Sequence, residues 1–178
     1  MSGGFLGALT LLAALGSGLV GGVFFGFSGF VMRALARLRP AQGIAAMQSI
    51  NVVATTPPLM FALFGTALAC VALVVASLSK VREPVVMLRL AGGGLFLVGT
   101  VLVTLVRNVP MNDALAAVDP VSAAGATEWA RYVPGWTTWN SVRTAAAIAA
   151  AAMLSLALFA SKDRASLRHA SFTLDRWT

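Results

Sequence analysis

The chain has 178 residues, of which 58% are hydrophobic and only 11% are charged. A soluble domain has about a quarter of its residues charged, so the composition excludes a water-soluble globule and indicates an integral membrane protein. The net charge of +7 does not indicate a nucleic-acid partner, because eleven of the thirteen basic residues are Arg and most lie at the ends of apolar runs, where cations contact lipid phosphates and set topology.

The first apolar run extends from Phe5 to Met32 and contains no charged residue. It lacks the basic flank of a signal peptide and is longer than the apolar part of one, so we expect a retained membrane helix. Gly18, Gly22 and Gly26 recur within it at four-residue spacing. Such a row permits close approach of another helix. It predicts either a packing seam inside the bundle or a contact with a second copy or another membrane protein.

Three further runs are long enough to cross a bilayer, which takes roughly 20 apolar residues. They cover about residues 59–78, 85–106 and 139–160. Pro57 and Pro58 precede the second run and suit the first turn of a helix. The sequence predicts an all-α, integral membrane four-helix bundle with spans at about 5–32, 59–78, 85–106 and 139–160, and with extra interfacial helical segments in the loops between spans one and two and between spans three and four.

We expect residues 1–162 to form a single membrane domain, followed by a basic tail over residues 163–178. The tail is interpreted either as an amphipathic segment on the anionic leaflet or as a frayed polar end. Four spans place both termini on one side, and the basic residues divide almost evenly between the two sides. Lys80, Arg82, Lys162 and Arg164 lie next to apolar runs, which favours cytoplasmic termini in a bacterial plasma membrane.

The loop between the first two spans contains "AAMQSINVVATTPP". Gln48, Asn51 and Thr55 fall at positions i, i+3 and i+7, which would form one polar stripe on a helix. The stripe indicates either a solvated interfacial helix or a helix whose polar side faces a cavity.

After the third span the chain reads "RNVPMNDALA". Asn108 could cap a new helix, with Pro110 in its first turn and Asp113 near its positive end. That interpretation does not require Arg107 or Asn112. A second interpretation is that these polar residues form one wall of a site.

The fourth span is preceded by "EWARYVPGWTTWNSVRT", which holds three of the four Trp residues. Trp129 is typical of a membrane interface, whereas Trp136, Asn140 and Arg143 share one helical face at positions i, i+4 and i+7. An Arg one turn inside a membrane helix normally extends back to the interface. If it faces inward instead, Asp113 is its natural partner.

Together these stretches predict a pocket at one mouth of the bundle, with aromatic rings, amides, one Arg and one carboxylate. Such walls suit a planar apolar ligand. The chain has no metal motif, phosphate loop or Ser/His/Asp set, and we expect no metal or cofactor. The candidate catalytic residues are Asp113 and Arg143, and the candidate binding residues are Gln48, Asn51, Asn108, Asn112, Trp136, Trp139 and Asn140.

Four stretches in this order resemble the anthrone oxygenase-like family of small four-helix membrane proteins. They are "FFGFSGFVMRAL", "GIAAMQSINVVATTPPLMFALFGTAL", "NVPMNDALAAVDP" and "WARYVPGWTTWNSVRTAAA". The resemblance covers most of the chain up to Phe159 and implies that the nine candidate residues are typical positions of the family. Two positions depart from the family pattern: Arg33 stands where a Pro is frequent, and Ser141 stands where a His is frequent.

Fungal members of this family are associated with oxidising polyketide anthrones to anthraquinones, a reaction that needs no external cofactor. The resemblance therefore implies that Asp113 acts as base, that Arg143 and the amides stabilise negative charge, and that Trp136 and Trp139 stack on the ligand. The alternative is a non-catalytic binder of quinone-like or lipid molecules, or an accessory subunit of a membrane complex. A small transporter is disfavoured, because the ionisable residues of the spans, Arg89 and Arg143, lie near span ends.

Overall fold

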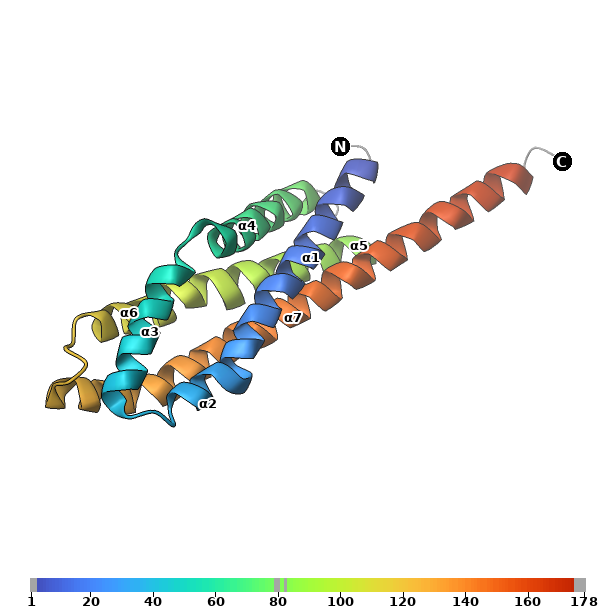
Figure 1. Ribbon diagram of the computed structural model, residues 1–178. Helices are drawn as coiled ribbons and strands as arrows, with labels where there is room; N and C mark the ends of the chain where they lie inside the picture. Colours follow the sequence, from blue (N-terminus) through green and yellow to red (C-terminus); the bar gives the residue numbers. More distant parts are fainter. Residues whose placement is uncertain (1–2, 79–80, 82, 175–178) are drawn as a thin grey trace.

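The computed structural model describes the backbone of residues 3–78, 81 and 83–174, and the side chains of residues 4–78, 81 and 83–161. Within these ranges the chain is helical and contains no strand. Four helices are long and apolar enough to cross a membrane: Gly4–Leu35, Pro57–Ser77, Pro84–Ala116 and Ala123–Ser161. The predicted all-α four-helix membrane bundle is confirmed, and α1 begins at the same end of the bundle as α7 ends (Figure 1).

Two of the spans are composite helices. The first joins α1 (Gly3–Gly26), the π-helical turn η1 (Phe27–Val31) and α2 (Met32–Leu35). The third joins α5 (Pro84–Leu95), the π-helical segments η3 (Phe96–Leu102) and η4 (Thr104–Asn108), and α6 (Val109–Ala116). A π-helical turn is wider than an α-helical turn but does not interrupt the helix. The helical backbone of the two spans continues to Leu35 and Ala116, past the ends that hydropathy predicted.

The second span is α4 (Pro57–Ser77), and the fourth belongs to α7 (Ala123–Leu174). The helix that contains the fourth span begins at Ala123, before the predicted membrane stretch of about 139–160, and continues through Pro134. Helix α3 (Pro40–Ala54) fills the loop between spans one and two, and α6 with the start of α7 fills the loop between spans three and four. The extra helical segments predicted in both loops are therefore present.

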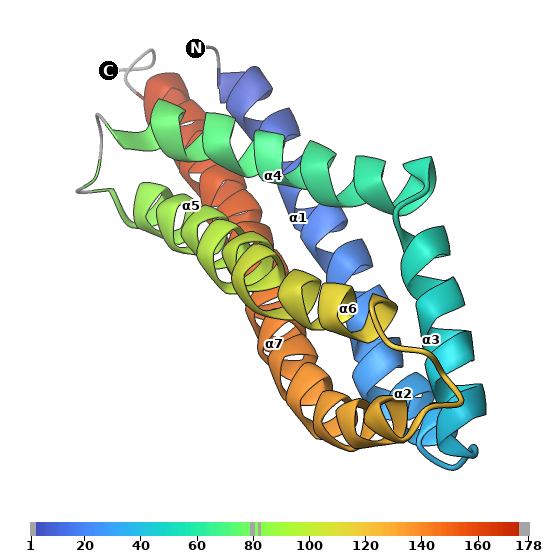
Figure 2. The same cartoon turned by 90° about the vertical axis from the view of Figure 1, so that its left-hand side faces the viewer.

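The spans differ in length. At 1.5 Å per residue, the 21 residues of α4 extend about 31 Å, which matches the hydrocarbon core of a bilayer. The other three spans have 32 to 39 residues and extend about 48 to 58 Å. Their additional turns form, with α3, what we call the helical cap: α2, α3, α6 and residues 123–136 of α7 (Figure 2).

Each half of the molecule has its own core. In the bundle, α1, α4, α5 and α7 bury an apolar cluster centred on Val20, Leu73, Phe96 and Leu154. In the helical cap, a second cluster is built from Met32, Leu35, Ile44, Met47, Leu115, Trp129, Tyr132 and Trp136. The cap is therefore a packed structure and not a set of solvated loops.

The glycine row of α1 does not form the seam inside the bundle. A Cβ at Gly22 would meet no atom within 4 Å, one at Gly18 would meet only Ala151 at 3.9 Å, and Gly26 faces Phe30 of its own span. That prediction is wrong because α4 and α7 pack on a neighbouring face, where Gly16 meets Thr66 and Gly21 meets Ala147. Contact with another protein through Gly18, Gly22 and Gly26 stays a prediction.

The expected orientation also stays a prediction. Lys80 and Arg82 lie outside the described residues, as do the side chains of the tail. The backbone of α7 continues as one helix through the predicted boundary at residue 162, up to Leu174.

Candidate functional site

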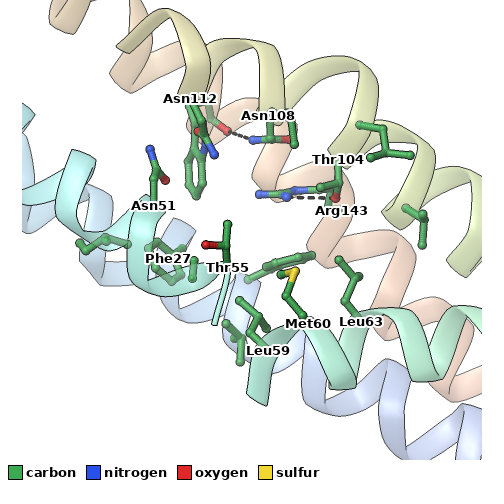
Figure 3. A pocket seen from close by; sticks show the side chains of 18 of the residues that line it. Phe27, Asn51, Thr55, Leu59, Met60, Leu63, Thr104, Asn108, Asn112 and Arg143 are labelled. Carbon is green, nitrogen blue, oxygen red and sulfur yellow. Dashed lines mark hydrogen bonds between the residues drawn. The ribbon is translucent and has the colours of Figure 1, made fainter. Parts of the chain in front are cut away.

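A cavity of about 190 Å³ lies where the bundle meets the helical cap. Figure 3 shows Thr104, Asn108, Asn112 and Arg143 along one side of it, opposite Leu59, Met60 and Leu63 of α4. Phe24 and Phe27 of the first span, together with Trp136 of α7, add aromatic surface. The cavity therefore has a polar wall and an apolar wall, with ring faces between them.

Arg143 is the charged residue of the polar wall, and its side chain is only 4% exposed. Its Nη2 donates to Asn140 Oδ1 at 2.7 Å and its Nη1 donates to Thr104 Oγ1 at 3.1 Å. The guanidinium carbon lies 4.1 Å from the ring centroid of Phe24 and 5.4 Å from that of Trp136. The predicted common face of Trp136, Asn140 and Arg143 is confirmed, and Arg143 faces inward.

The expected ion pair between Arg143 and Asp113 is wrong. The Asp113 side chain is exposed, and no Asp or Glu is among the described side chains that line the cavity. The physical reason is the helical twist of about 100° per residue, which turns Asp113 outward when its neighbour Asn112 faces the cavity. The geometry gives Asp113 no access to a ligand held by Arg143.

Asn108 is 1% exposed and does not cap a helix. Its backbone is helical, with φ −74° and ψ −38°, and its side chain makes no capping bond. The capping prediction is wrong because η4 leads directly into α6 without a break in the helix. Pro110 has no N–H to donate to a carbonyl of the preceding turn, and the widened turns of η4 accommodate that unbonded carbonyl. Asn108 Nδ2 donates to the Trp136 carbonyl at 3.3 Å, and its Oδ1 has no partner.

Asn112 holds two aromatic side chains of α7 in place. Its Oδ1 accepts hydrogen bonds from Tyr132 Oη at 2.8 Å and from Trp136 Nε1 at 2.7 Å. The rings of Trp129, Tyr132 and Trp136 are stacked, with centroids 5.7 and 6.1 Å apart. These rings are buried in the core of the cap, so the interfacial interpretation of Trp129 does not hold.

The polar stripe of α3 divides between two roles. Gln48 Nε2 donates to the carbonyls of Leu115 and Val118 at 2.9 and 3.1 Å, and so closes the end of α6 away from the cavity. Asn51 and Thr55 line the cavity, and Asn51 Nδ2 is buried without a partner. Five predicted site residues thus line the cavity, namely Asn51, Asn108, Asn112, Trp136 and Arg143, while Asn140 supports Arg143 from outside it.

Trp139 does not line the cavity. It is half-buried, and the Arg107 guanidinium lies over its ring at 4.6 Å. The predicted stacking of Trp139 on a ligand therefore has no place in this cavity.

Comparison with known protein families identifies the region that builds the polar wall. The family model described as anthrone oxygenase matches residues 58–153, more than half of the chain. The chain belongs to the anthrone oxygenase family. No curated protein and no solved structure gave a significant match. The region shared with the anthrone oxygenase family includes Asn108, Asn112, Trp136 and Arg143, whereas Phe24 and Asn51 come from helices outside it.

Ser141 and Arg33, the two positions expected to depart from the family pattern, lie away from the cavity. They line a separate groove between the first span and α7. The Ser141 and Ser28 hydroxyls are 2.9 Å apart, and Asn140 Nδ2 donates to Ser28 Oγ at 2.8 Å. Ser141 therefore reaches Arg143 only indirectly, through Ser28 and Asn140.

Among the residues that line the cavity and that sequence reasoning missed are Phe24, Phe27 and Thr104. The hydroxyl of Thr104 in the run "VLVTLV" is a signal that could have found it. Phe24 and Phe27 carry no such signal, because many other Phe residues of the chain face outward, among them Phe25 and Phe61.

The cavity offers a specific set of chemical groups. A buried guanidinium lacks a neutralising carboxylate, and its Nε has no hydrogen-bond partner. Asn108 Oδ1 is a free acceptor and Asn51 Nδ2 is a free donor. Burying an unpaired charge costs several kcal/mol, so a ligand that supplies a negatively charged oxygen recovers part of that cost.

Proposed function

We propose that the protein is a cofactor-independent oxygenase that oxidises a flat, weakly acidic, polycyclic aromatic compound of the anthrone type. The observation that carries the proposal is Arg143, a buried cation without a carboxylate partner in a cavity walled by aromatic rings. Membership of the anthrone oxygenase family supports it.

The cavity has the shape and polarity for a flat ring with oxygen at one edge. An apolar cavity of about 150 Å³ accommodates benzene. This one measures about 190 Å³, so it would hold part of a polycyclic ring system while the rest extends toward the exposed lining residues. Phe27 and Trp136 offer ring faces, and Met60 offers an adaptable apolar surface. The oxygen substituent at the edge of the ring would lie against Arg143, within reach of Asn108 and Asn51.

The reaction needs only the substrate and O₂. Loss of a proton from the carbon between two aryl rings gives an electron-rich anion, which transfers one electron to O₂. The carbon radical and superoxide combine and take up the proton, which gives a hydroperoxide. Cleavage of its O–O bond with loss of water leaves a carbonyl group. Overall, a CH₂ group and O₂ become a C=O group and H₂O.

Arg143 would act by stabilising the substrate anion. The proposal does not use Asp113 as base, because its carboxylate is exposed and outside the cavity. Instead, the guanidinium favours the ionised form of the bound substrate, and the proton passes to water or hydroxide. Donors already held in place make such stabilisation effective, since they need no reorganisation during the reaction.

The test is O₂ consumption and quinone formation by the purified protein in lipid nanodiscs with anthrone, corrected for the spontaneous reaction. We expect Arg143→Gln to lower the rate about 100-fold, the loss typical of removing one anion-stabilising donor. The matched control is Arg107→Gln, which removes an exposed Arg outside the cavity and should leave the rate unchanged. Arg143→Lys keeps the charge and should retain part of the activity. A wild-type rate equal to the spontaneous background would refute the proposal.

A second candidate function is binding of a quinone-like aromatic molecule without turnover. The observation that favours it is the lack of a carboxylate or imidazole among the described cavity-lining side chains. This candidate predicts that anthraquinone binds with the same dependence on Arg143 while anthrone is not consumed. Titration of the protein's tryptophan fluorescence with each compound separates the two functions.

A further inference from the structure

We infer that the ligand enters the cavity sideways from the hydrocarbon of the bilayer, between α4 and the third span. This inference rests on the proposed function, since it concerns the route to the same cavity. We call the opening the lateral mouth and define it by Thr55, Phe64, Leu105 and Val109.

The exposure of the lining residues locates the mouth. Among the residues that line the cavity, these four are exposed, and the others are buried or half-buried. Thr55 and Phe64 lie at the corner before α4 and on α4, and Leu105 and Val109 lie on the third span. Phe64 and Leu105 are each 54% exposed. Figure 2 shows α4 diverging from the third span toward the cap, and the four residues belong to this end of the two spans by their positions in the elements.

The depth of the mouth decides what it opens to. Helix α4 begins at Pro57 and is only about as long as the hydrocarbon core is thick. Phe64 is seven residues farther along the helix, which places it about 10 Å inside that end. Thr55 and Val109 mark the edge of the mouth at the boundary with the cap, whereas its Phe64 side faces acyl chains, so molecules dissolved in the bilayer can reach it.

The other sides of the cavity are closed by packed side chains. Toward the cap, Met47, Leu115 and Tyr132 are fully buried in one cluster. Toward the groove behind α7, Asn140 is fully buried, and its Nδ2 donates to the Phe24 carbonyl at 2.6 Å as well as to Ser28. A route from water through either side would have to break these contacts.

Helix α4 is also the least enclosed of the spans. In its most apolar stretch, 22% of residues are buried, against 33 to 39% for the other three spans. Helix α4 packs closely against glycines of its neighbours at two places: Thr66 contacts Gly16 of α1, and Val74 contacts Gly93 of α5. Thr66 and Val74 both lie beyond Phe64, so these contacts fix the middle and the end of α4, while its first two turns border the mouth.

The polarity along this route fits a ligand that enters neutral and ionises inside. Phe64, Leu105 and Met60 at the mouth are apolar, and the guanidinium lies on the inner wall. A neutral flat ring system partitions into hydrocarbon, whereas its anion does not. The ligand class inferred from the route is therefore an uncharged, lipid-soluble polycyclic phenol or ketone.

The experiment measures binding and release of 1,8-dihydroxyanthraquinone by stopped-flow quenching of tryptophan fluorescence in nanodiscs. Leu105→Trp should narrow the mouth and lower both rate constants about tenfold, and Phe64→Ala should raise both. The dissociation constant should stay nearly unchanged, because a mouth affects both directions equally. Leu102→Trp and Phe61→Ala are matched controls, since both residues are exposed on the same helices but do not line the cavity.

The outcomes separate this inference from the proposed function. Tight binding with unchanged rate constants in Leu105→Trp and Phe64→Ala would overturn the lateral mouth and leave the proposed function intact. A changed dissociation constant with an unchanged association rate would also overturn it, since these residues would then belong to the binding surface. No binding to the wild-type protein would overturn both.

Discussion

Arg143 remains buried because several weak interactions replace a carboxylate. Asn140 and Thr104 accept hydrogen bonds from it, and the rings of Phe24 and Trp136 lie within cation–π distance. A cation–π contact contributes about 0.5 to 2 kcal/mol, which does not fully offset the cost of burying the charge. We expect the remaining imbalance to give the cavity a preference for an anion.

Asn140→Asp tests this electrostatic preference. The new carboxylate would lie at the position of Asn140 Oδ1, which is 2.7 Å from Arg143 Nη2, and would neutralise the guanidinium. We expect at least a tenfold loss of affinity for 1,8-dihydroxyanthraquinone, measured by fluorescence titration. Thermal unfolding should show some destabilisation as well, because the new carboxylate cannot donate to the Phe24 carbonyl or to Ser28 Oγ as Asn140 Nδ2 does. Ser141→Asp is the control, because it adds the same charge on the groove side and should bind normally. Unchanged affinity in Asn140→Asp would show that the charge of Arg143 does not act on the ligand.

Asn112→Leu tests the support of the aromatic wall. The substitution keeps the number and branching of the side-chain heavy atoms but leaves the Tyr132 hydroxyl and the Trp136 indole N–H without their acceptor. A buried donor without a partner costs about 1 to 3 kcal/mol, so we expect at least about 2 kcal/mol of destabilisation, measured by denaturant titration in detergent. The exposed Gln42→Leu should change stability by less than about 0.5 kcal/mol.

Single-residue orientation could be predicted only where the secondary structure was predicted correctly. The spacing of Trp136, Asn140 and Arg143 placed them on one face because that stretch is helical. The side of the helix that faces the cavity could not be predicted for Asn112 and Asp113, because the sequence alone does not show which of two adjacent polar residues points inward, and it is Asn112 that lines the cavity. Distant contacts, such as that between Arg143 and Phe24, have no signal in a single sequence.

Among the helical elements, each of the π-helical segments η1, η3 and η4 contributes residues to the cavity. Phe27 comes from η1, Val101 from η3, and Thr104 and Asn108 from η4. Widened turns of this kind are rare in proteins, and those that occur are often found at functional sites. They shift the helical phase, so a fixed period of 3.6 residues does not predict which residues of the third span face inward.

The contact between α1 and α4 depends on Gly16. A Cβ there would lie 2.0 Å from Thr66 Oγ1, 3.0 Å from Thr66 Cβ and 3.1 Å from Thr66 Cγ2. Rotation of the Thr66 side chain would not move its Cβ, so the clash cannot be fully relieved in this way. We expect Gly16→Ala to destabilise the protein by about 1 to 3 kcal/mol, measured by thermal or denaturant unfolding in detergent. Gly22→Ala is the matched control, since a Cβ there meets nothing within 4 Å, and helix propensity should make it neutral or slightly stabilising. Equal effects at both positions would contradict the packing described for α1 and α4.

The helices of the bundle were predictable, and the full length of each helix was less so. Hydropathy located all four spans because a bilayer requires long apolar helices. It did not show that the fourth helix already begins at Ala123, because residues 123–138 carry polar and aromatic side chains that pack within the cap instead of facing lipid. The start of α4 was predicted well, because Pro57 and Pro58 mark its first turn.

At the scale of the whole molecule, the difference in span length divides the protein into a part within the hydrocarbon and a part beyond it. The helical cap contains α3, whose Ser49 is exposed, whereas Leu68 is 71% exposed near the middle of α4. Both side chains are therefore on the protein surface, but we expect only Ser49 to face water.

Cysteine labelling checks this placement. In a Cys70→Ser background, Ser49→Cys should react with a membrane-impermeant maleimide and Leu68→Cys should not, while both should react after denaturation in SDS. In intact bacterial cells, labelling of Ser49→Cys from outside would support the predicted cytoplasmic termini, because α3 lies at the end opposite the start of α1. Rapid labelling of Leu68→Cys in the folded protein would contradict a transmembrane α4.

The short α4 beside three longer helices has a consequence for the lipid environment. Only α4 is matched closely to the hydrocarbon thickness, so a thicker or thinner bilayer changes its tilt more than that of its neighbours. Since α4 forms one side of the lateral mouth, hydrophobic mismatch would alter the width of the mouth. Ligand association should then vary between nanodiscs of short-chain and long-chain phosphatidylcholine at constant affinity, which would make membrane thickness a regulator of access to the cavity.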